Sequence, residues 1–190
     1  MLNQRIKGLY GITPNKDLDI TLIENAMKTH KVNILQYRRK IIDEQRKLSE
    51  ATQLQKLCLA HNTLFIVNDD INLCEKICAD GVHLGQNDAD IVSARRQLGE
   101  KFIIGVSCYN NLKLAIDAEN KGANYIALGA IFKSTTKPNA DSCSLSKIQE
   151  VREKIDIPIV GIGGITFENQ KHAYESGCDS VAMLSGLFNS

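Results

Sequence analysis

Several features that would assign a protein to a specialised class are missing from this sequence. Its 23 lysines and arginines nearly balance 22 aspartates and glutamates, so no excess positive charge is available to attract a nucleic acid. No uninterrupted apolar run approaches the roughly 18 residues needed to span a membrane. The first residues lack the apolar core of a signal peptide. These absences favour a cytoplasmic protein that binds neither nucleic acid nor membrane.

The six cysteines also lack the pattern of a metal or disulfide site. No two of them form a CxxC pair, and most lie among apolar neighbours, which is typical of reduced, buried thiols. Cys74 and Cys78 are one helical turn apart, but no second Cys or His pair completes a zinc site. We interpret the four histidines as structural residues as well.

What the sequence does contain is an alternation of short apolar segments with longer amphipathic ones. Eight segments rich in β-branched residues are predicted strands: GLYGIT, VNILQYR, LFIVN, GVHLG, FIIGVSC, YIALGAIF, IPIVGIGGI and SVAMLSGL. Between them, as in residues 19–30, 44–62 and 111–122, apolar residues recur three and four positions apart, which predicts helices. Eight βα units predict an α/β fold, the (β/α)8 or TIM barrel, with a doubly wound open sheet as the alternative.

Residues 1–190 are predicted to form a single domain, because no linker, low-complexity segment or shift in composition divides them. Only about seven residues precede the first predicted strand and few follow the last, so the eighth helix is expected to be absent or vestigial. The length also lies below the usual ~200-residue lower limit of this barrel. We therefore expect either a poorly protected flank or a partner that covers it, such as a second copy in a homo-oligomer.

The second predicted strand ends in a basic segment, QYRRK. Strand alternation puts Gln36, Arg38 and Lys40 on one side and Tyr37 and Arg39 on the other. Since the carboxyl ends of parallel barrel strands form one mouth, an amide and two cations are predicted to face it. In isolation the segment is equally consistent with a solvated, charged strand end.

Acidic residues follow the third and fourth predicted strands. Asn68 and Asp69 end the third, and Asp88 follows the fourth in GQND. A helix cap explains Asp90 but not Asp88. Asp69 and Asp88 are predicted to approach one Mg2+, which prefers a few carboxylates together with substrate phosphate oxygens. Beside the cations of the second strand, this pair indicates a bound diphosphate.

Later segments of the predicted mouth suggest a second anion site. After the sixth strand, residues 134–137 place three hydroxyls and a lysine before Pro138, in a loop suited to fold over an anion. The seventh strand ends in GIGGI and the eighth in LSG, where such barrels commonly bind phosphate through backbone N–H groups. Ser107, after the fifth strand, is uninformative by itself.

These segments, in this order, resemble the thiamine-phosphate synthase family over nearly the whole chain, through GLYGIT, QYRRK, VND, GVHLGQND, IGVSCYN, YIALGAIFKSTTKPNA, VGIGGIT and SVAMLSG. The resemblance implies a Mg2+-dependent transferase that joins a hydroxymethylpyrimidine diphosphate to hydroxyethylthiazole phosphate, giving thiamine phosphate and diphosphate. Diphosphate would leave first, and the thiazole nitrogen would then attack the pyrimidine cation.

The resemblance also implies roles for individual residues. Asp69 and Asp88 would hold the Mg2+, and the residues expected to act in catalysis are Arg38, Lys40, Ser107 and Lys137. The contacts expected for the pyrimidine diphosphate are Gln36, Arg38, Lys40, Asn68, Ser107 and Lys137, to which we add Tyr37 and Arg39 from the same strand end. The contacts expected for the thiazole phosphate are Ser134, Thr135, Thr136, Gly164, Leu184 and Ser185.

Two alternatives and one departure from the family pattern bear on this interpretation. Arg39 stands where the family usually has an acidic residue, and it adds charge near the diphosphate only if it faces the mouth. A related subgroup of thiazole tautomerases has a His two residues after the fifth-strand Ser, where this chain has Tyr109. A non-catalytic phosphate-binding barrel would need none of Asp69, Asp88 and Lys137.

Overall fold

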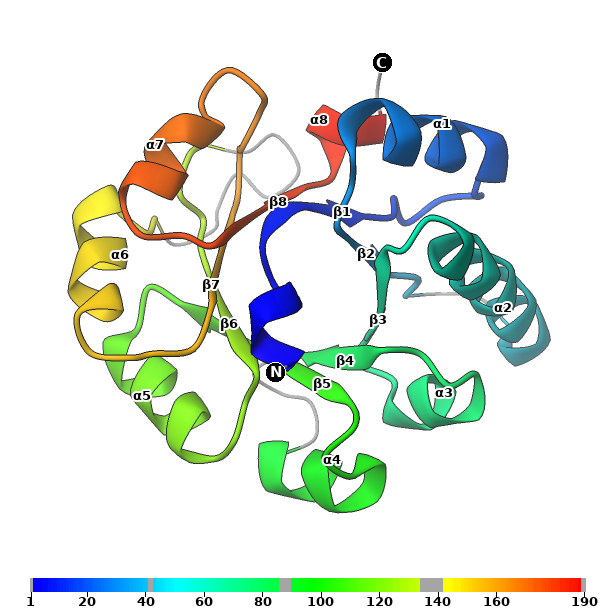
Figure 1. Cartoon of the computed structure of the whole chain (residues 1–190), viewed down its shortest axis with the longest axis horizontal. Coiled ribbons are helices and arrows are strands. Elements are labelled where there is room, and N and C mark those ends of the chain that lie inside the picture. The colour runs from blue at the N-terminus through cyan, green and yellow to red at the C-terminus, as the bar shows by residue number, and fades with distance from the viewer. Residues whose placement is uncertain (1, 41–42, 86–89, 134–141, 189–190) are drawn as a thin grey trace.

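The computed structural model describes residues 2–40, 43–85, 90–133 and 142–188, and its strands form a closed, wholly parallel barrel (Figure 1). The strands are β1 (Gly8–Ile12), β2 (Ile34–Tyr37), β3 (Leu64–Asn68), β4 (Gly81–Leu84), β5 (Ile103–Tyr109), β6 (Tyr125–Leu128), β7 (Ile159–Ile162) and β8 (Ser180–Met183). Each pairs with the next in sequence, and β8 pairs with β1 to close the ring. The predicted (β/α)8 barrel is confirmed, and the open sheet is excluded.

The helices surround the barrel (Figure 1). They are α1 (Ile20–His30), α2 (Glu44–Ala60), α3 (Ile71–Lys76), α4 (Ile91–Leu98), α5 (Leu112–Asn120), α6 (Leu145–Arg152), α7 (Gln170–Glu175) and α8 (Ser185–Phe188). Six of them start at a polar residue whose side chain accepts a backbone N–H of the first turn: Asp19, Asp43, Asp70, Asp90, Asn111 and Ser144. None of the helices in the described ranges is long and apolar enough to cross a membrane.

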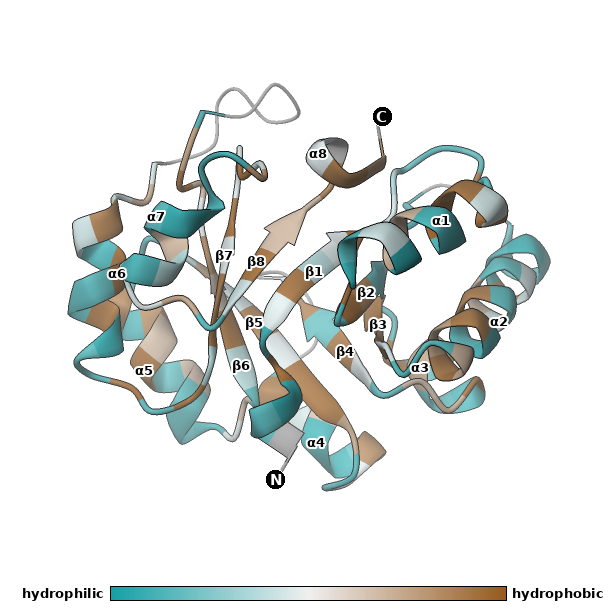
Figure 2. Ribbon diagram, turned by 45° about the horizontal axis from the view of Figure 1, so that its top comes forward, coloured by the Kyte–Doolittle hydropathy of each residue, from teal (hydrophilic) through white to brown (hydrophobic). Residues whose placement is uncertain are grey.

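Two hydrophobic clusters bury both faces of the strands, which explains why the strand sequences are almost continuously apolar. The larger cluster lies between the strands and the helices, and the smaller one fills the barrel. A 3-10 helix, η1 (Leu2–Arg5), lies across the centre of the ring in Figure 1. Ile6, the residue that follows it, belongs to the interior cluster. In Figure 2 the strands are largely brown, whereas the helices carry most of the teal, hydrophilic residues.

The short helix α8 covers the flank where a full eighth helix would lie. Leu187 and Phe188 are 1% and 3% exposed. They lie against Gly11 of β1, where an added Cβ would be only 2.8 Å from Leu187 Cδ2. On the same flank, the ring of Phe167 stacks on His30 with 4.5 Å between centroids. The vestigial helix is therefore confirmed, but the expected bare flank is not, because β1 is buried by residues of this chain.

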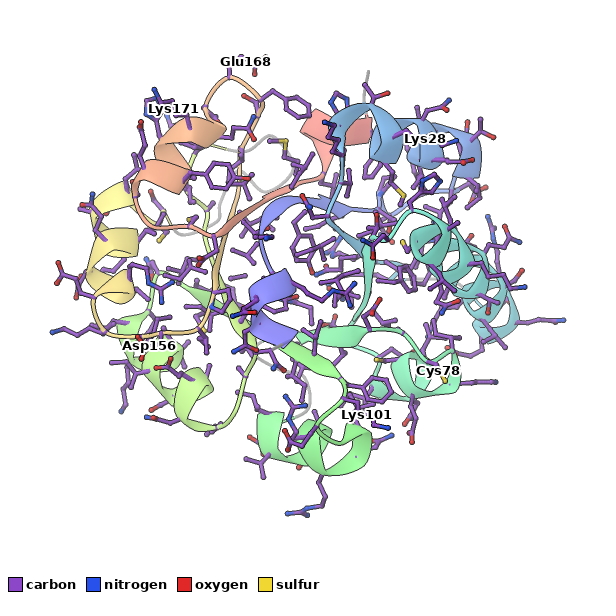
Figure 3. All side chains as sticks on the ribbon, in the orientation of Figure 1. Lys28, Cys78, Lys101, Asp156, Glu168 and Lys171 are labelled. Carbon is purple, nitrogen blue, oxygen red and sulfur yellow. The ribbon has the colours of Figure 1, made fainter. Side chains whose placement is uncertain are left out.

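The cysteines are free thiols in the structure, and five of them are buried. Only Cys78 is exposed, and Figure 3 labels it at α3. The prediction of buried, reduced thiols is thus confirmed for every cysteine except Cys78.

Candidate active site

Gln36 lies in β2 with its side chain inside the barrel. It is 4% exposed, and its Nε2 donates a hydrogen bond to the Tyr10 hydroxyl at 2.8 Å. Among the described residues no group bonds the Gln36 amide oxygen, and no fully buried side-chain oxygen lacks a partner there. The oxygen therefore opens onto the mouth, where it can accept a hydrogen bond from a ligand.

Arg38 and Lys40 follow the end of β2, and the chain after β1 holds their backbone. The Arg38 N–H donates to Thr13 Oγ1 and the Lys40 N–H to Asn15 Oδ1, each at 2.9 Å. Thr13 is fully buried, so the two strand ends are fixed to one another. Thr13 and Asn15 are not among the predicted site residues. Their position directly after the first apolar segment was the feature that could have indicated them.

Tyr37 and Arg39 point the other way, toward α2. The Tyr37 hydroxyl donates to Glu50 Oε2 at 2.9 Å, and Arg39 Nε donates to the same oxygen at 3.1 Å. Burial, and then the neighbouring Glu50, raise the pKa of Tyr37. Gln36 and Tyr37 therefore point to opposite faces as predicted, and the Tyr37 and Arg39 side chains, bonded to Glu50 of α2, face the outer helix layer rather than the mouth.

The two aspartates after β3 have different surroundings. Asp70 caps α3, and its Oδ2 accepts a hydrogen bond from Lys47 Nζ at 3.0 Å. Asp69 adopts a left-handed conformation with φ of 63°, and its N–H donates to the His83 carbonyl at 2.9 Å. Its carboxylate accepts from the Asn68 amide. Since non-glycine residues with positive φ are uncommon and gather at functional sites, Asp69 is the acid to consider for ligand binding.

Asp69 fits a magnesium site of the kind that is completed by substrate phosphate. Such sites need only one or two protein carboxylates. Within the parts of the chain that the structure describes, no group of three or more His, Cys, Asp or Glu residues is placed to hold a metal by itself. Because Asn68 of β3 pairs with His83 of β4, the carboxyl ends of these two strands lie side by side. Asp90, as expected, caps α4.

Ser107 lies on β5, and its hydroxyl is 2.9 Å from His83 Nε2. A β-bulge between Ser107 and Tyr109 shifts the pairing with β6, and Tyr109 has a φ of 56° and is 40% exposed. Bulges at barrel rims re-aim side chains. Here the bulge turns Tyr109 outward, while Ser107 is bonded to a residue of the barrel interior.

The end of β7 is built for close backbone approach. Gly163 and Gly164 have φ values of 101° and 60°, and a Cβ on Gly164 would lie 2.4 Å from the Lys133 carbonyl oxygen. Asn169 Nδ2 donates to the Gly164 carbonyl at 2.9 Å and fixes the turn. Gly164 therefore lies against the segment that follows β6, as the predicted phosphate site requires.

The remaining predicted residues fall into two groups. Leu184 is half-buried directly after β8, and Ser185 is the first residue of α8. Five others lie outside the described residues: Asp88, Ser134, Thr135, Thr136 and Lys137.

Three buried polar residues inside the barrel, Tyr10, His83 and Tyr125, connect Gln36 with Ser107. We predicted none of them as part of the site. The signal in the sequence was a polar residue at an inward position of an otherwise apolar strand, which in a small barrel must find a hydrogen-bond partner.

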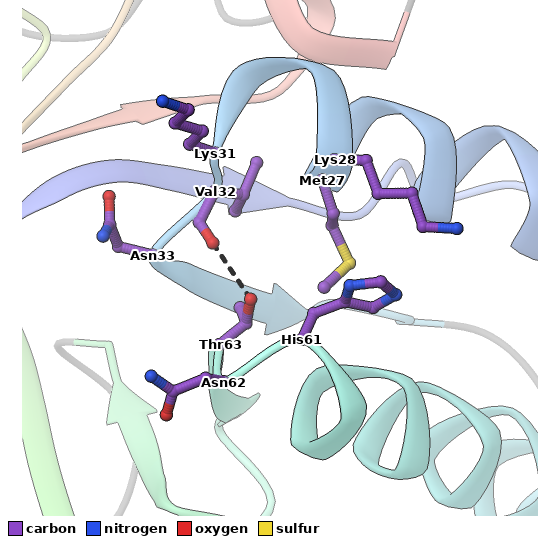
Figure 4. A pocket seen from close by; sticks show the side chains of 8 residues that line it. All are labelled: Met27, Lys28, Lys31, Val32, Asn33, His61, Asn62 and Thr63. Atoms are coloured by element: carbon purple, nitrogen blue, oxygen red, sulfur yellow. Dashed lines mark hydrogen bonds between the residues drawn. The ribbon is translucent and has the colours of Figure 1, made fainter.

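A pocket of about 340 Å³ lies elsewhere, where α1 ends and β2 and β3 begin (Figure 4). Its lining includes Lys28, Lys31, His61 and Thr63, and the Thr63 hydroxyl donates to the Val32 carbonyl at 2.9 Å. These residues precede the strands, whereas the mouth lies after them. None of the predicted site residues lines this pocket.

Comparison with known proteins gives a consistent result. A model of the thiamine monophosphate synthase family matches residues 9–187. The chain is 45% identical to a thiamine-phosphate synthase of Chromobacterium violaceum over 97% of this chain and 90% of that protein. For the thiamine-phosphate synthase of Nitrosococcus oceani the identity is 43%, over 100% and 88%.

Two solved structures have a similar fold. A thiamine phosphate pyrophosphorylase from Pyrococcus furiosus superposes with a TM-score of 0.90 at 29% identity, covering 100% of this chain and 91% of that one. An N-acetylmannosamine-6-phosphate 2-epimerase from Clostridium perfringens, with a TM-score of 0.72 at 12% identity over 98% and 90%, shares the fold.

Proposed function

Because the chain belongs to the thiamine monophosphate synthase family, we propose that it is a transferase that joins a hydroxymethylpyrimidine diphosphate to hydroxyethylthiazole phosphate. The products are thiamine phosphate and diphosphate. The observation that carries the proposal is the family match over residues 9–187. It is supported by the barrel topology, in which the segments that hold Gln36, Arg38, Lys40 and Asp69 follow or end neighbouring parallel strands.

The reaction needs charge neutralisation more than a nucleophile. The bond between the pyrimidine methylene carbon and the diphosphate oxygen breaks, and the departing diphosphate keeps the electron pair. The lone pair of the thiazole nitrogen then forms the new C–N bond to that carbon. Since negative charge grows on the leaving group, cations fixed beside it lower the barrier. Arg38, Lys40 and Lys137 are proposed for this role.

Asp69 and Asp88 would hold Mg2+ beside the same leaving diphosphate. When bound, the ion supplies Lewis-acid stabilisation of the leaving diphosphate. Asp69 supports this assignment because its left-handed backbone and its place directly after β3 set it at the strand end next to β4, whereas Asp70 caps α3 and bonds Lys47. Asn68, which donates to the Asp69 carboxylate, is proposed to orient it and to contact the pyrimidine diphosphate.

The other proposed contacts place the two substrates against each other. Gln36 and Ser107 bind the pyrimidine ring, and the thiazole phosphate is bound by Gly164, Leu184, Ser185 and residues 134–136. Holding both substrates in one mouth turns an encounter of two molecules into a step within one complex, which lowers the entropic part of the barrier. Both substrates carry phosphate charge and do not cross membranes readily, so we propose a cytoplasmic location.

A direct assay tests the proposal. The purified protein is incubated with both substrates, and thiamine phosphate is measured by chromatography with Mg2+ or with a chelator. We expect product only when both substrates and the metal are present. Absence of turnover in folded protein would reject the synthase activity, whereas undiminished turnover in the chelator would reject only the metal.

A further inference from the structure

A continuous chain of hydrogen bonds crosses the barrel interior beneath the proposed active site. Gln36 Nε2 lies 2.8 Å from the Tyr10 hydroxyl, which lies 2.9 Å from the Tyr125 hydroxyl. The Tyr125 hydroxyl lies 3.0 Å from His83 Nδ1, and His83 Nε2 lies 2.9 Å from Ser107 Oγ. The chain therefore links two residues of the mouth, on β2 and β5, through three residues that do not reach it.

The direction of every bond follows from proton counting. Gln36 Nε2 can only donate, so Tyr10 accepts and its single proton must go to Tyr125. If Tyr125 donated to Tyr10 instead, the buried Tyr10 proton would have no acceptor among the described residues, which is costly. Tyr125 therefore donates to His83 Nδ1, which leaves the proton of the neutral imidazole on Nε2, where it is donated to Ser107.

The environment keeps these groups in one protonation state and one place. Burial raises the pKa of Tyr10 and Tyr125, so both hydroxyls keep their protons at physiological pH. The Tyr125 ring lies directly over Gly105 of β5, where an added Cβ would be 2.0 Å from Tyr125 Cζ. His83 is 8% exposed, and its ring lies 5.6 Å from that of Tyr125.

The two ends of this hydrogen-bond chain, Gln36 and Ser107, consequently have opposite polarity. With its nitrogen committed to Tyr10, Gln36 turns its amide oxygen, an acceptor, to the mouth. Ser107 accepts from His83 and keeps its own proton to donate, since the described residues supply no acceptor for it. An aminopyrimidine offers the complementary pair, an exocyclic N–H donor and ring-nitrogen acceptors, whereas an oxopyrimidine presents a carbonyl oxygen in place of the amino group.

We propose that Tyr10, Tyr125 and His83 are positioning residues whose one-way hydrogen-bond chain orients Gln36 as an acceptor and Ser107 as a donor and so selects an amino- over an oxopyrimidine diphosphate. The inference rests on the proposed function for its substrate class. The polarity of the chain itself does not depend on that function.

The kinetic test compares Tyr10→Phe with Thr63→Val. Tyr10→Phe removes the acceptor that holds the Gln36 nitrogen, so the amide is released to turn over. We expect KM for the aminopyrimidine diphosphate to rise about 10-fold and the preference in kcat/KM over the oxo analogue to fall at least as much, with KM for the thiazole phosphate unchanged. Thr63→Val removes one buried hydroxyl at the opposite end of the barrel and should leave all three values unchanged.

Tyr125→Phe breaks the chain in the middle and should reproduce the loss of preference if Tyr10→Phe does not fold. Equal amino-to-oxo preference in the wild type and in either folded phenylalanine variant would overturn the proposal. The proposal would also be overturned if Thr63→Val lost the same amino-to-oxo preference as the phenylalanine variants at an equal drop in melting temperature.

A spectroscopic test separates this inference from the proposed function. With only four histidines, nitrogen-15 shifts of the imidazoles can be assigned with the aid of His83→Asn. We expect His83 to be neutral with its proton on Nε2. A proton on Nδ1 would overturn the proposed polarity even in an active synthase, whereas a protein with the Nε2 proton that makes no thiamine phosphate would fail the proposed function alone.

Discussion

At the scale of single residues, Asp69 and Asp70 show how backbone conformation gives two adjacent aspartates different surroundings. Asp70 has an extended backbone, so its side chain folds back to cap α3 and to bind Lys47. The left-handed conformation of Asp69 prevents the same use. The pair could be located from the sequence, but the division of labour could not, since it depends on φ and on the position of Lys47 in another helix.

Exchanging each acid should separate activity from stability. Asp69→Asn keeps a residue that tolerates positive φ and should lower turnover at least ~100-fold with little change in melting temperature. Asp70→Ala should cost about 1 kcal/mol of unfolding free energy through loss of the cap, with near-normal turnover in the folded fraction. Chemical denaturation and the thiamine phosphate assay measure both. Parallel losses in the two variants would count against Asp69 as a metal ligand.

Cysteine reactivity gives a second prediction at this scale. Burial raises the pKa of Cys74, Cys108 and Cys178 to about 12 each, so these thiols are both shielded and protonated. We expect a thiol reagent such as DTNB to modify one cysteine of the native protein quickly and the others only on unfolding. Cys78→Ser should abolish the fast phase, and a fast phase that survives this change would place the exposed thiol elsewhere.

At the scale of elements, the end of β2 serves two purposes because successive side chains alternate. Gln36 points inward, while Tyr37 and Arg39 reach Glu50 of α2. The Arg39 side chain is 6% exposed and that of Glu50 13%, so the pair is shielded from solvent. Arg46 reaches the same carboxylate from an exposed position.

This arrangement predicts unequal effects for the two arginines. Arg39→Ala should cost about 2 kcal/mol of unfolding free energy, below the 3–5 kcal/mol of an isolated buried pair because Arg46 and Tyr37 still bond Glu50. Arg46→Ala, with its exposed side chain, should cost less than about 1 kcal/mol. KM for the pyrimidine diphosphate should not change in Arg39→Ala. A rise in that KM would show that Arg39 contacts the substrate.

The eighth helix permits a matched comparison of two phenylalanines on one flank. Phe188 of α8 is 3% exposed, whereas Phe167 is 37% exposed and stacks on His30. Phe188→Ala should lower the free energy of unfolding by about 3 kcal/mol, a value typical of a buried aromatic ring. Phe167→Ala should lower it by less than half as much. Thermal or urea denaturation measures both, and similar values would mean that α8 adds little to the fold.

Most of the element order was predictable, because strand and helix periodicities differ and polar caps mark helix starts. The predicted strands were too long where they continued into glycine: β7, for example, ends at Ile162, before Gly163 and Gly164. The apolar residues that follow the true strand end pack against neighbouring loops and do not pair with a strand. Local sequence patterns do not distinguish these two kinds of burial.

At the scale of the whole molecule, the barrel topology explains which parts of the site could be predicted. Charged residues after strands, such as Arg38 and Asp69, converge by a general property of parallel barrels. The interior chain through Tyr10, His83 and Tyr125 could not be predicted in the same way. Its members are separated by as many as 115 residues, and their contact depends on ring positions fixed by the register of several strands.

The seam between β1 and β8 has a consequence for biosynthesis. Gly8 pairs with Ser180, whose hydroxyl donates to the Gly8 carbonyl at 2.8 Å across 172 residues of sequence. A nascent chain on the ribosome therefore keeps this edge of β1 unpaired until β8 has been synthesised, and such an edge is a natural target for chaperones. Tyr10 lies on β1 and Leu184 directly follows β8, so the segments on both sides of this seam reach their final positions only when the two strands pair.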